Sequence, residues 1–322
     1  MKISVVMAAH RPSVQLLDSL HSIFRTYLGD MECILVLDGA IEADLSAALN
    51  IFALRENRLI LVAVEHAGLT RALMAGCAMA RGGYIARLDV GDVMTSDRLQ
   101  RQSAILARHP DCVLVTSDVE VCGPKWEPLA VKRCDPPMAK PRWINTGPLE
   151  QGLSLDIPHH ASVMFRRSAY EAAGGYRPQF YFGQDWDLWY RLAEQGCFFH
   201  IPEVLTRVRL FPGALSSRYW REQREIATLS RACYVARGRG QSESAYLERA
   251  AEIRPQRPLA GRYRPWWPFC RGRAEGNYFI AESLRRIGDP RCCGYFAAAI
   301  RSEPWRPRFW LRAIQALGMA PG

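Results

Sequence analysis

The sequence predicts an α/β protein built on a mostly parallel sheet that helices cover on both faces. Three observations support this fold class. Short, continuously apolar runs recur through the first part of the chain, which is typical of strands buried on both faces. These runs alternate with segments in which apolar residues recur at helical spacing. Polar residues directly follow several runs, as expected where strands end at a ligand-binding edge.

The first strands and helices can be placed in order along the chain. The apolar runs predict strands over residues 3–8, 33–37, 59–64 and 84–88, and the helical stripes predict helices over 13–28 and 69–80. Beyond residue 112 the alternation weakens around a loop-rich stretch at 124–158. There the sequence predicts strands over 112–121 and 161–165, and helices over 168–173 and 187–193.

The C-terminal part is predicted to be mainly helical, and it carries the basic charge of the chain. Helices are expected over 220–236, 276–287, 292–302 and 305–317, and a Pro- and Arg-rich stretch over 254–273 reads as a linker. The net charge is +10, yet residues 204–322 alone hold 22 Arg, no Lys and 9 acidic residues. This excess of positive charge concerns the molecules that the protein binds rather than its fold.

Composition excludes several classes of protein. No window approaches the roughly 20 apolar residues of a membrane span, and the first residues fit a buried strand better than a signal peptide. The ten cysteines form no CxxC pair, which favours free thiols in the cytoplasm. No GxGxxG follows the first strand, so a dehydrogenase is not favoured, and the basic part lacks a nucleic-acid recognition pattern.

A short acidic motif, Asp89-Val90-Gly91-Asp92, follows the fourth predicted strand. Two carboxylates on one turn can offer hard oxygen ligands to Mg²⁺ or Mn²⁺ and leave positions for a diphosphate. The alternative is that Asp92 caps a helix that runs through Leu99. Because ligands bind beyond the carboxyl ends of parallel strands, the position of the motif favours the metal interpretation.

Four segments, in this order, resemble the family 2 glycosyltransferases of the GT-A fold. They are SVVMAAHRP (4–12), ECILVLDGA (32–40), GLTRALMAGCAMARGGYIARLDVGDVMTSDRLQRQ (68–102) and PHHASVMFRRSAYEAAGGYRPQFYFGQDWDLWYRL (158–192). The resemblance covers about residues 1–216. It implies a GT-A domain over 1–216, with a nucleotide-sugar half (1–112) and an acceptor half (113–216), followed by a basic helical extension over 217–322.

The resemblance also implies a donor site. The metal, Mn²⁺ or Mg²⁺, is expected on Asp92 with help from Asp89. A nucleotide sugar, with UDP favoured, is expected against further residues: Ala8, Ala9, His10, Asp38, Arg71 and Asp89. Asp38 also fits an ordinary Asp-Gly turn, and Arg71 an ordinary solvated arginine.

On the acceptor side, the resemblance implies that Asp185 is the general base of an inverting transfer. Asp187 competes for this role but is expected to cap a helix. Gln184 and Trp186 are expected to contact the acceptor, although Trp186 equally fits a core aromatic. His159 and His160 precede a predicted strand whose successive residues face opposite ways, so only His160 is expected to face the cleft.

The sequence departs from the family pattern at three positions. Gly91 and Gln184 stand where relatives carry acidic residues, and Phe211 stands where they often carry a metal-assisting histidine. Arg207 and Arg209 remain as candidate phosphate contacts. These departures keep open a degenerate domain that binds sugar without turnover, and a nucleotidyltransferase is the other alternative.

No features of a processive synthase are present, so the resemblance implies a single-addition, hexosyltransferase-type enzyme of cell-surface polysaccharide or glycolipid synthesis. The expected acceptor is a saccharide or a lipid-linked saccharide, and no nucleic acid is expected. Trp266 and Trp267, set among arginines, would suit an anionic membrane surface or pack in an exposed loop. The expected location is the cytoplasm, with peripheral contact to the inner membrane face.

Overall fold

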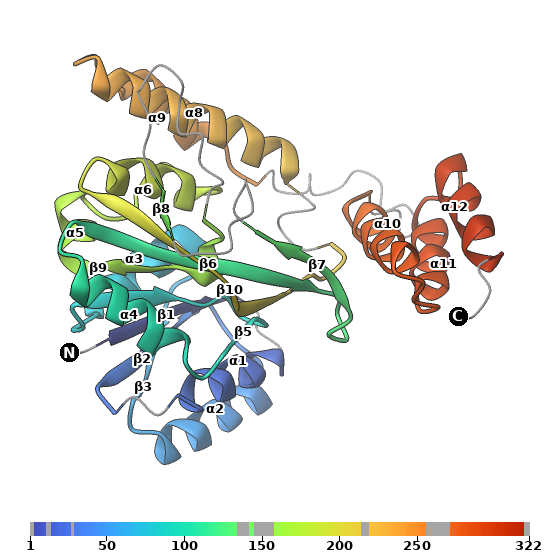
Figure 1. The fold of residues 1–322 in the computed structure, drawn as a ribbon, viewed down its shortest axis with the longest axis horizontal. Coiled ribbons are helices and arrows are strands. Elements are labelled where there is room, and N and C mark those ends of the chain that lie inside the picture. The colour runs from blue at the N-terminus through green and yellow to red at the C-terminus, as the bar shows by residue number, and fades with distance from the viewer. Residues whose placement is uncertain are drawn as a thin grey trace. The chain divides into compact units, whose positions relative to one another are not determined.

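The chain is described by a computed structural model that covers residues 3–10, 14–26, 29–133, 142–144, 158–213, 219–255 and 271–318. It divides into two compact units (Figure 1). The first comprises residues 1–119, 132–208 and 225–254, and the second comprises 120–131, 209–224 and 255–322. The expected boundary after residue 216 does not coincide with this division, because residues 225–254 cluster with the sheet.

A mixed sheet forms the centre of the fold. Its parallel part has the order β3 (Leu59–Val64), β2 (Met31–Asp38), β1 (Ile3–Ala9) and β4 (Tyr84–Arg87). The order continues through β9 (Met164–Arg166), β6 (Cys112–Cys122), β10 (Cys197–Arg209) and β5 (Val93–Met94), with β7 (Pro128–Lys132) beside β6 and β8 (Arg142–Ile144) beside β10. The four predicted N-terminal strands are confirmed.

Helices cover both faces of this sheet (Figure 1). One face packs against α1 (Gln15–Phe24), α2 (Ala43–Arg55) and α4 (Arg98–Arg108), and the other against α3 (Leu69–Met79), α5 (Arg167–Ala172) and α6 (Gln184–Ala193). Alternate residues of β1 enter different cores, since Val5 and Met7 face one side and Val6 the other. The predicted double-sided α/β arrangement is therefore confirmed.

The structure corrects the predicted strand over residues 161–165. His160–Ser162 form one 3-10 turn, and β9 begins only at Met164. The hydroxyl of Ser162 donates to the carbonyl of His159 at 2.9 Å, which closes the turn. The assumption that His159 and His160 point to opposite faces of a strand is therefore wrong.

The C-terminal region contains α8 (Trp220–Gly238) and α9 (Ser244–Glu252), followed by α10 (Arg271–Arg286), α11 (Cys292–Ser302) and α12 (Pro307–Leu317). The last three helices confirm the prediction. Leu284 and Phe296 are buried among them, whereas Phe279 and Ile287 are 49% and 60% exposed. Within the described residues, every helix is too short or too polar to cross a bilayer.

Candidate functional site

The acidic motif forms a tight turn beyond the end of β4. Gly91 has φ +96°, a left-handed conformation that side-chain-bearing residues rarely adopt, and its amide donates to the Ser19 hydroxyl at 2.9 Å. The amide of Met94 donates to the Ser22 hydroxyl at 3.2 Å, so two serines of α1 hold the turn. Because β5 follows Asp92 directly and α4 begins only at Arg98, Asp92 does not cap a helix.

The two carboxylates of the turn differ in exposure. The side chain of Asp89 is 36% exposed, and its Oδ1 accepts from the Arg87 guanidinium at 2.7 Å, whereas Asp92 is only 4% exposed. Burial alone would raise the pKa of Asp89, but the charges of Arg87 and neighbouring residues outweigh it and lower the pKa overall. Asp89 is thus ionised at neutral pH, and this pair of oxygen donors fits Mg²⁺ or Mn²⁺.

Two buried arginines lie beside the acidic turn, and sequence reasoning missed both. Arg87 and Arg98 are fully buried, and the Arg98 guanidinium donates to the carbonyls of Arg87 and Val163 at 2.8 and 3.1 Å. Burial, then the charge of Arg87, lowers the pKa of Arg98 to about 9. Two cations beside two carboxylates leave little net attraction for a metal unless a diphosphate adds negative charge. The sequence contained one indication of Arg87, because an arginine ends the apolar strand two residues before Asp89.

His160 lies beside Asp89. Its Nε2 is 2.8 Å from the Tyr176 hydroxyl and 3.3 Å from Nε of Arg87. Because arginine can only donate, Nε2 is the acceptor, and the ring proton is assigned to Nδ1, which is 4.0 Å from Oδ2 of Asp89. Burial lowers the pKa of His160 to about 3, so the ring is neutral at physiological pH.

Asp185 occupies the first turn of α6. Burial raises its pKa to about 6, backbone hydrogen bonds oppose this shift, and the charge of Asp89 adds to it. The influence of Asp89 means that the acidic turn and this carboxylate are near enough to interact electrostatically. Gln184 is buried beside Asp185, while Trp186 is half-buried. A carboxylate that titrates near neutral pH suits proton abstraction.

Asp187 has a structural role and is not the cap of its helix, which begins at Gln184. It is 1% exposed, and its Oδ2 accepts from Nε of Arg191 at 3.0 Å. Arg191 in turn donates to the backbone carbonyls of Ala173 and Gly175. A carboxylate fixed in this way is a poor candidate for the base.

Asp38 ends β2, and a loop after β3 satisfies its carboxylate. Oδ1 accepts from the amide of Ala67 at 2.8 Å, and Oδ2 accepts from the amide of Gly68 at 3.1 Å and from Nδ1 of His66 at 2.9 Å. Asp38 therefore positions the entry to α3, on whose first turn Arg71 is exposed. Nothing in the sequence pattern indicated His66.

His10, Asp38 and His66 form a group of potential metal ligands. The two imidazoles are stacked, with centroids 4.0 Å apart and 20° between their planes. A metal lies in the plane of an imidazole that ligates it, and two stacked rings with nearly parallel planes are poorly placed to hold one ion in both planes. Nδ1 of His10 also donates to the carbonyl of Asp38 at 2.8 Å. The geometry favours a stacked histidine pair over a metal site.

The predicted residues at the sheet edge come together as expected. β1 lies between β2 and β4, and all three run parallel, so His10, Asp38 and Asp89 lie at the carboxyl ends of adjacent strands. Arg207 of β10 pairs in register with Val93, immediately after the acidic turn. Arg209 instead stacks on Trp126, with its guanidinium carbon 3.9 Å from the centroid of the indole ring. The same guanidinium carbon is 5.8 Å from the ring centroid of Phe211.

Comparison with known sequences gives one consistent result. The sequence profile described as glycosyl transferase family 2 matches residues 4–174. The amylovoran biosynthesis glycosyltransferase AmsE of Erwinia amylovora is 29% identical over 200 residues, which cover 61% of this chain and 69% of that protein.

Solved structures resemble the fold at low sequence identity. The S. aureus TarS 1-349 complex with UDP gives a TM-score of 0.53 at 11% identity, covering 98% of this chain and 89% of that one. GalNAc-T7 with UDP, GalNAc and Mn²⁺ gives a TM-score of 0.53 at 13% identity, covering 78% of this chain and 57% of that one. These likenesses establish the GT-A fold.

Proposed function

The chain belongs to glycosyl transferase family 2, and on this premise we propose that it transfers a sugar from a nucleoside-diphosphate donor to a hydroxyl acceptor with inversion. The observation that carries the proposal is that the charge of Asp89 acts on Asp185. An acidic turn suited to a metal lies within electrostatic reach of a carboxylate whose pKa is raised to about 6. This proximity is what a donor site and its catalytic base would require.

On the donor side, Asp92 and Asp89 would hold Mn²⁺ or Mg²⁺. A bound metal would neutralise the charge that develops on the departing diphosphate. His10, Asp38 and Arg71, with the backbone of Ala8 and Ala9, would bind the nucleotide at the same edge, and Arg207 would add a cation near the phosphates. UDP is the favoured nucleotide, which is consistent with the UDP named in both structural neighbours.

On the acceptor side, Asp185 would take the proton from the attacking hydroxyl. Gln184 is neutral and therefore does not add a second charge that would raise the pKa of Asp185 further. His160, neutral and beside Asp89, would orient that carboxylate, while Gln184 and Trp186 would contact the acceptor. The acceptor would be a saccharide or a lipid-linked saccharide in polysaccharide synthesis, as the name of the Erwinia relative suggests.

A screen of nucleotide sugars tests this function. Release of a nucleoside diphosphate from at least one donor, lost on chelation of the metal, would support the proposed reaction. Metal-dependent nucleotide binding without any donor turnover, in the presence of saccharide acceptors, would favour the degenerate binding domain. Release of pyrophosphate from a nucleoside triphosphate would instead indicate a nucleotidyltransferase.

The proposed base predicts how activity depends on pH. Burial raises the pKa of Asp185 to about 6, and the base acts only when deprotonated. We therefore expect kcat/KM to rise with pH, to be half-maximal at about pH 6 and to level off above pH 7. Initial rates at saturating Mn²⁺ would measure this profile. A rate that is flat or falls between pH 5 and pH 7 would contradict the assignment.

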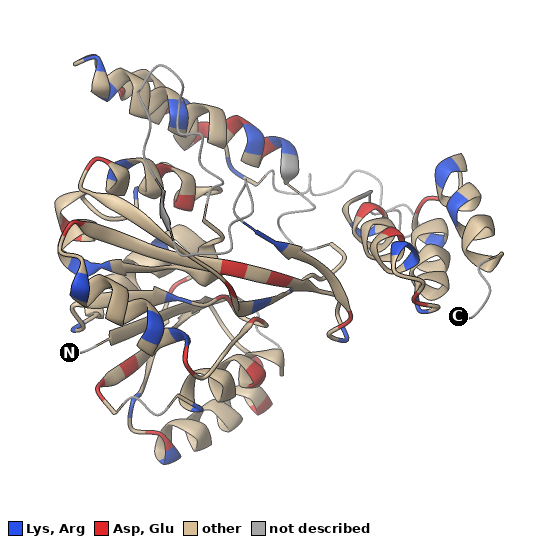
Figure 2. Cartoon of the chain, viewed as in Figure 1, with Lys and Arg blue, Asp and Glu red and all other residues tan. Residues whose placement is uncertain are grey.

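We also propose that α12 lies on an anionic membrane surface at the cytoplasmic face. Its exposed apolar side chains recur on one helical face, at Trp310, Leu311, Ile314 and Leu317, which are 48–76% exposed. Arginines recur along α10, α11 and α12 (Figure 2), and residues 271–318 hold nine Arg against four acidic residues. Apolar and arginine side chains together suit an anionic bilayer. Trp266 and Trp267, first considered for this role, lie outside the described residues.

Removing this apolar face should weaken membrane binding. The double variant Leu311→Ser/Ile314→Ser is expected to lower binding to phosphatidylglycerol vesicles by about tenfold, because it removes two side chains that would enter the interface. Cosedimentation measures the change, and Leu54→Ser on α2, a side chain 87% exposed, is the matched control. Equal binding of both variants, or no preference for phosphatidylglycerol over phosphatidylcholine, would rule out this surface.

A further inference from the structure

The helical hairpin α8–α9 packs along the helix that carries Asp185. Residues 225–254 belong to the same compact unit as the sheet, although they lie beyond the residues matched by the family profile. They contact α6 at its beginning, along its length and at its end. We propose that this hairpin holds Asp185 in its reactive position, with Ile226 and Glu243 as positioning residues; this inference rests on the proposed role of Asp185.

The first contact is at the beginning of α6. Gly183 caps the helix with φ +57°, and a Cβ atom placed on it would lie only 2.8 Å from Cγ2 of Ile226. Ile226 is fully buried. Its side chain therefore fills the space directly beside the backbone that enters the first turn, two residues before Asp185. Displacement of Ile226 would free that turn to shift.

Further contacts follow α6 to its C-terminal end. The rings of Tyr190 and Tyr234 are stacked with centroids 5.0 Å apart, and both residues are buried. Arg237 of α8 donates to Glu194, the residue that caps α6, at 2.8 Å. The hairpin thus contacts α6 from its N-terminal cap to its C-terminal cap, and close packing over this length holds the two elements in a fixed arrangement.

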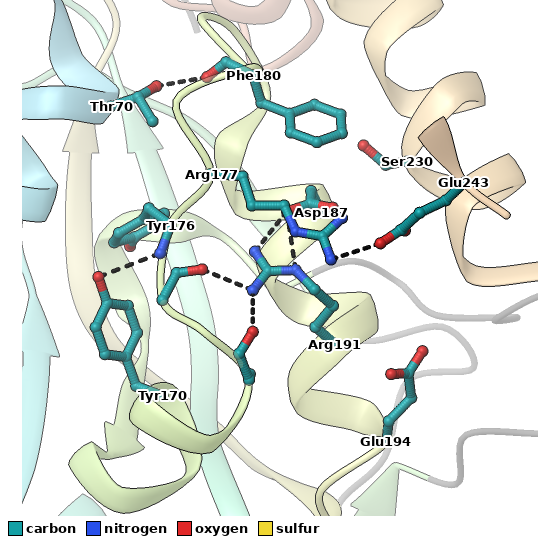
Figure 3. A network of polar contacts seen from close by, with 12 residues as sticks. Thr70, Tyr170, Tyr176, Arg177, Phe180, Asp187, Arg191, Glu194, Ser230 and Glu243 are labelled. Carbon is teal, nitrogen blue, oxygen red and sulfur yellow. Dashed lines mark hydrogen bonds and ion pairs between the residues drawn. The ribbon is translucent and has the colours of Figure 1, made fainter. Parts of the chain in front are cut away.

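Glu243 joins the hairpin to a network of charged side chains under α6 (Figure 3). Its Oε1 accepts from Arg177 at 2.8 Å and its Oε2 accepts from Arg237. Arg177 also lies 3.7 Å from Oδ1 of Asp187, the α6 residue that Arg191 binds. Glu243 is therefore the bridge between the hairpin and the charged side of α6.

The charges in this network balance. Three arginines, at 177, 191 and 237, face three carboxylates, at 187, 194 and 243. Burial alone would raise the pKa of Glu243, but hydrogen bonds from Arg177 and Arg237 lower it overall, so the carboxylate is ionised at neutral pH. Neutralising Glu243 would leave Arg177 and Arg237 without their shared counter-charge, and the hairpin would lose its link to Asp187.

The variant Glu243→Gln tests this role. We expect kcat to fall by about tenfold through misplacement of Asp185, with the KM for the donor and the Mn²⁺-dependent affinity for UDP unchanged. The pH midpoint of about 6 should also move lower, because a loosened first turn is better hydrated. Glu225→Gln is the matched control: Glu225 binds Arg249 in an exposed pair within the hairpin itself, and its loss should leave kcat unchanged.

A second pair of variants tests the same role if the Glu243→Gln protein does not fold. Ile226→Val and Ile226→Ala should lower kcat in graded steps, again without changing UDP affinity. A wild-type kcat and pH midpoint in folded Glu243→Gln and Ile226→Ala would overturn the inference, and so would equal losses of kcat and UDP affinity. If Asp185→Asn keeps its activity, the proposed role of Asp185 as the base fails instead, and if the wild-type protein turns over no nucleotide sugar, the proposed function fails; the failures are thereby distinguished.

Discussion

Asp185→Asn is expected to lower kcat by about a thousandfold, because the asparagine amide cannot accept the proton of the acceptor hydroxyl. Asn has nearly the shape of Asp, so the first turn of α6 should persist and the affinity for UDP should remain unchanged. Burial raises the pKa of Asp185, and the same environment should therefore accept the neutral amide of asparagine. Steady-state rates, combined with UDP binding, measure the two effects separately.

The neighbouring carboxylate provides the control. Asp187→Asn breaks a buried pair with Arg191, and we expect it to destabilise the fold by about 3–5 kcal/mol. The protein that still folds should lose no more of its kcat than the roughly tenfold expected for Glu243→Gln, far less than the thousandfold loss expected for Asp185→Asn. The opposite pattern, with activity retained in Asp185→Asn and lost in folded Asp187→Asn, would exchange the roles of the two residues.

Asp92→Ala should abolish the metal dependence of nucleotide binding and lower the transfer rate by about a hundredfold or more. Loss of one carboxylate leaves Asp89, already paired with Arg87, to hold the metal beside two buried arginines. A metal contributes several kcal/mol to stabilising charge on a leaving phosphate, and about 3 kcal/mol corresponds to a hundredfold in rate. Electron paramagnetic resonance of free Mn²⁺ measures its uptake in the presence of UDP.

Asp97→Ala is the matched control for this experiment. Asp97 lies at the start of α4 with its side chain half exposed, five residues beyond Asp92. Its loss should leave Mn²⁺ uptake unchanged. Undiminished uptake by the Asp92→Ala variant would show that the acidic turn does not hold the metal.

The sequence could predict the parallel part of the sheet because its strands are apolar on both faces. Helices and strands whose apolar residues do not follow one regular spacing were harder to predict. The apolar residues of α2 do not form one stripe: Leu45 and Leu49 are buried, whereas Ile51 and Leu54 are exposed, and this helix was not predicted. Strand β10 was missed for a similar reason, since its 13 residues mix buried and half-buried positions.

The candidate site could be predicted where it depended on position along a strand. Asp38 and Asp89 follow strands, so their common edge was foreseeable. Tertiary partners were not: His66 binds Asp38 from a loop 28 residues away, and Arg87 turns out to be fully buried. Such contacts arise from packing between distant segments, and neither spacing nor periodicity encodes them.

Titration of UDP into the wild-type protein, with Mn²⁺ and again with the metal chelated, would test whether the acidic turn forms a metal-dependent donor site. We expect UDP to bind with Mn²⁺ and to lose most of its affinity on chelation, because the carboxylates of Asp89 and Asp92 attract the metal strongly only when the diphosphate is present. Absence of UDP binding under both conditions, or an affinity that does not change with metal, would contradict a metal-dependent, UDP-sugar-using transferase.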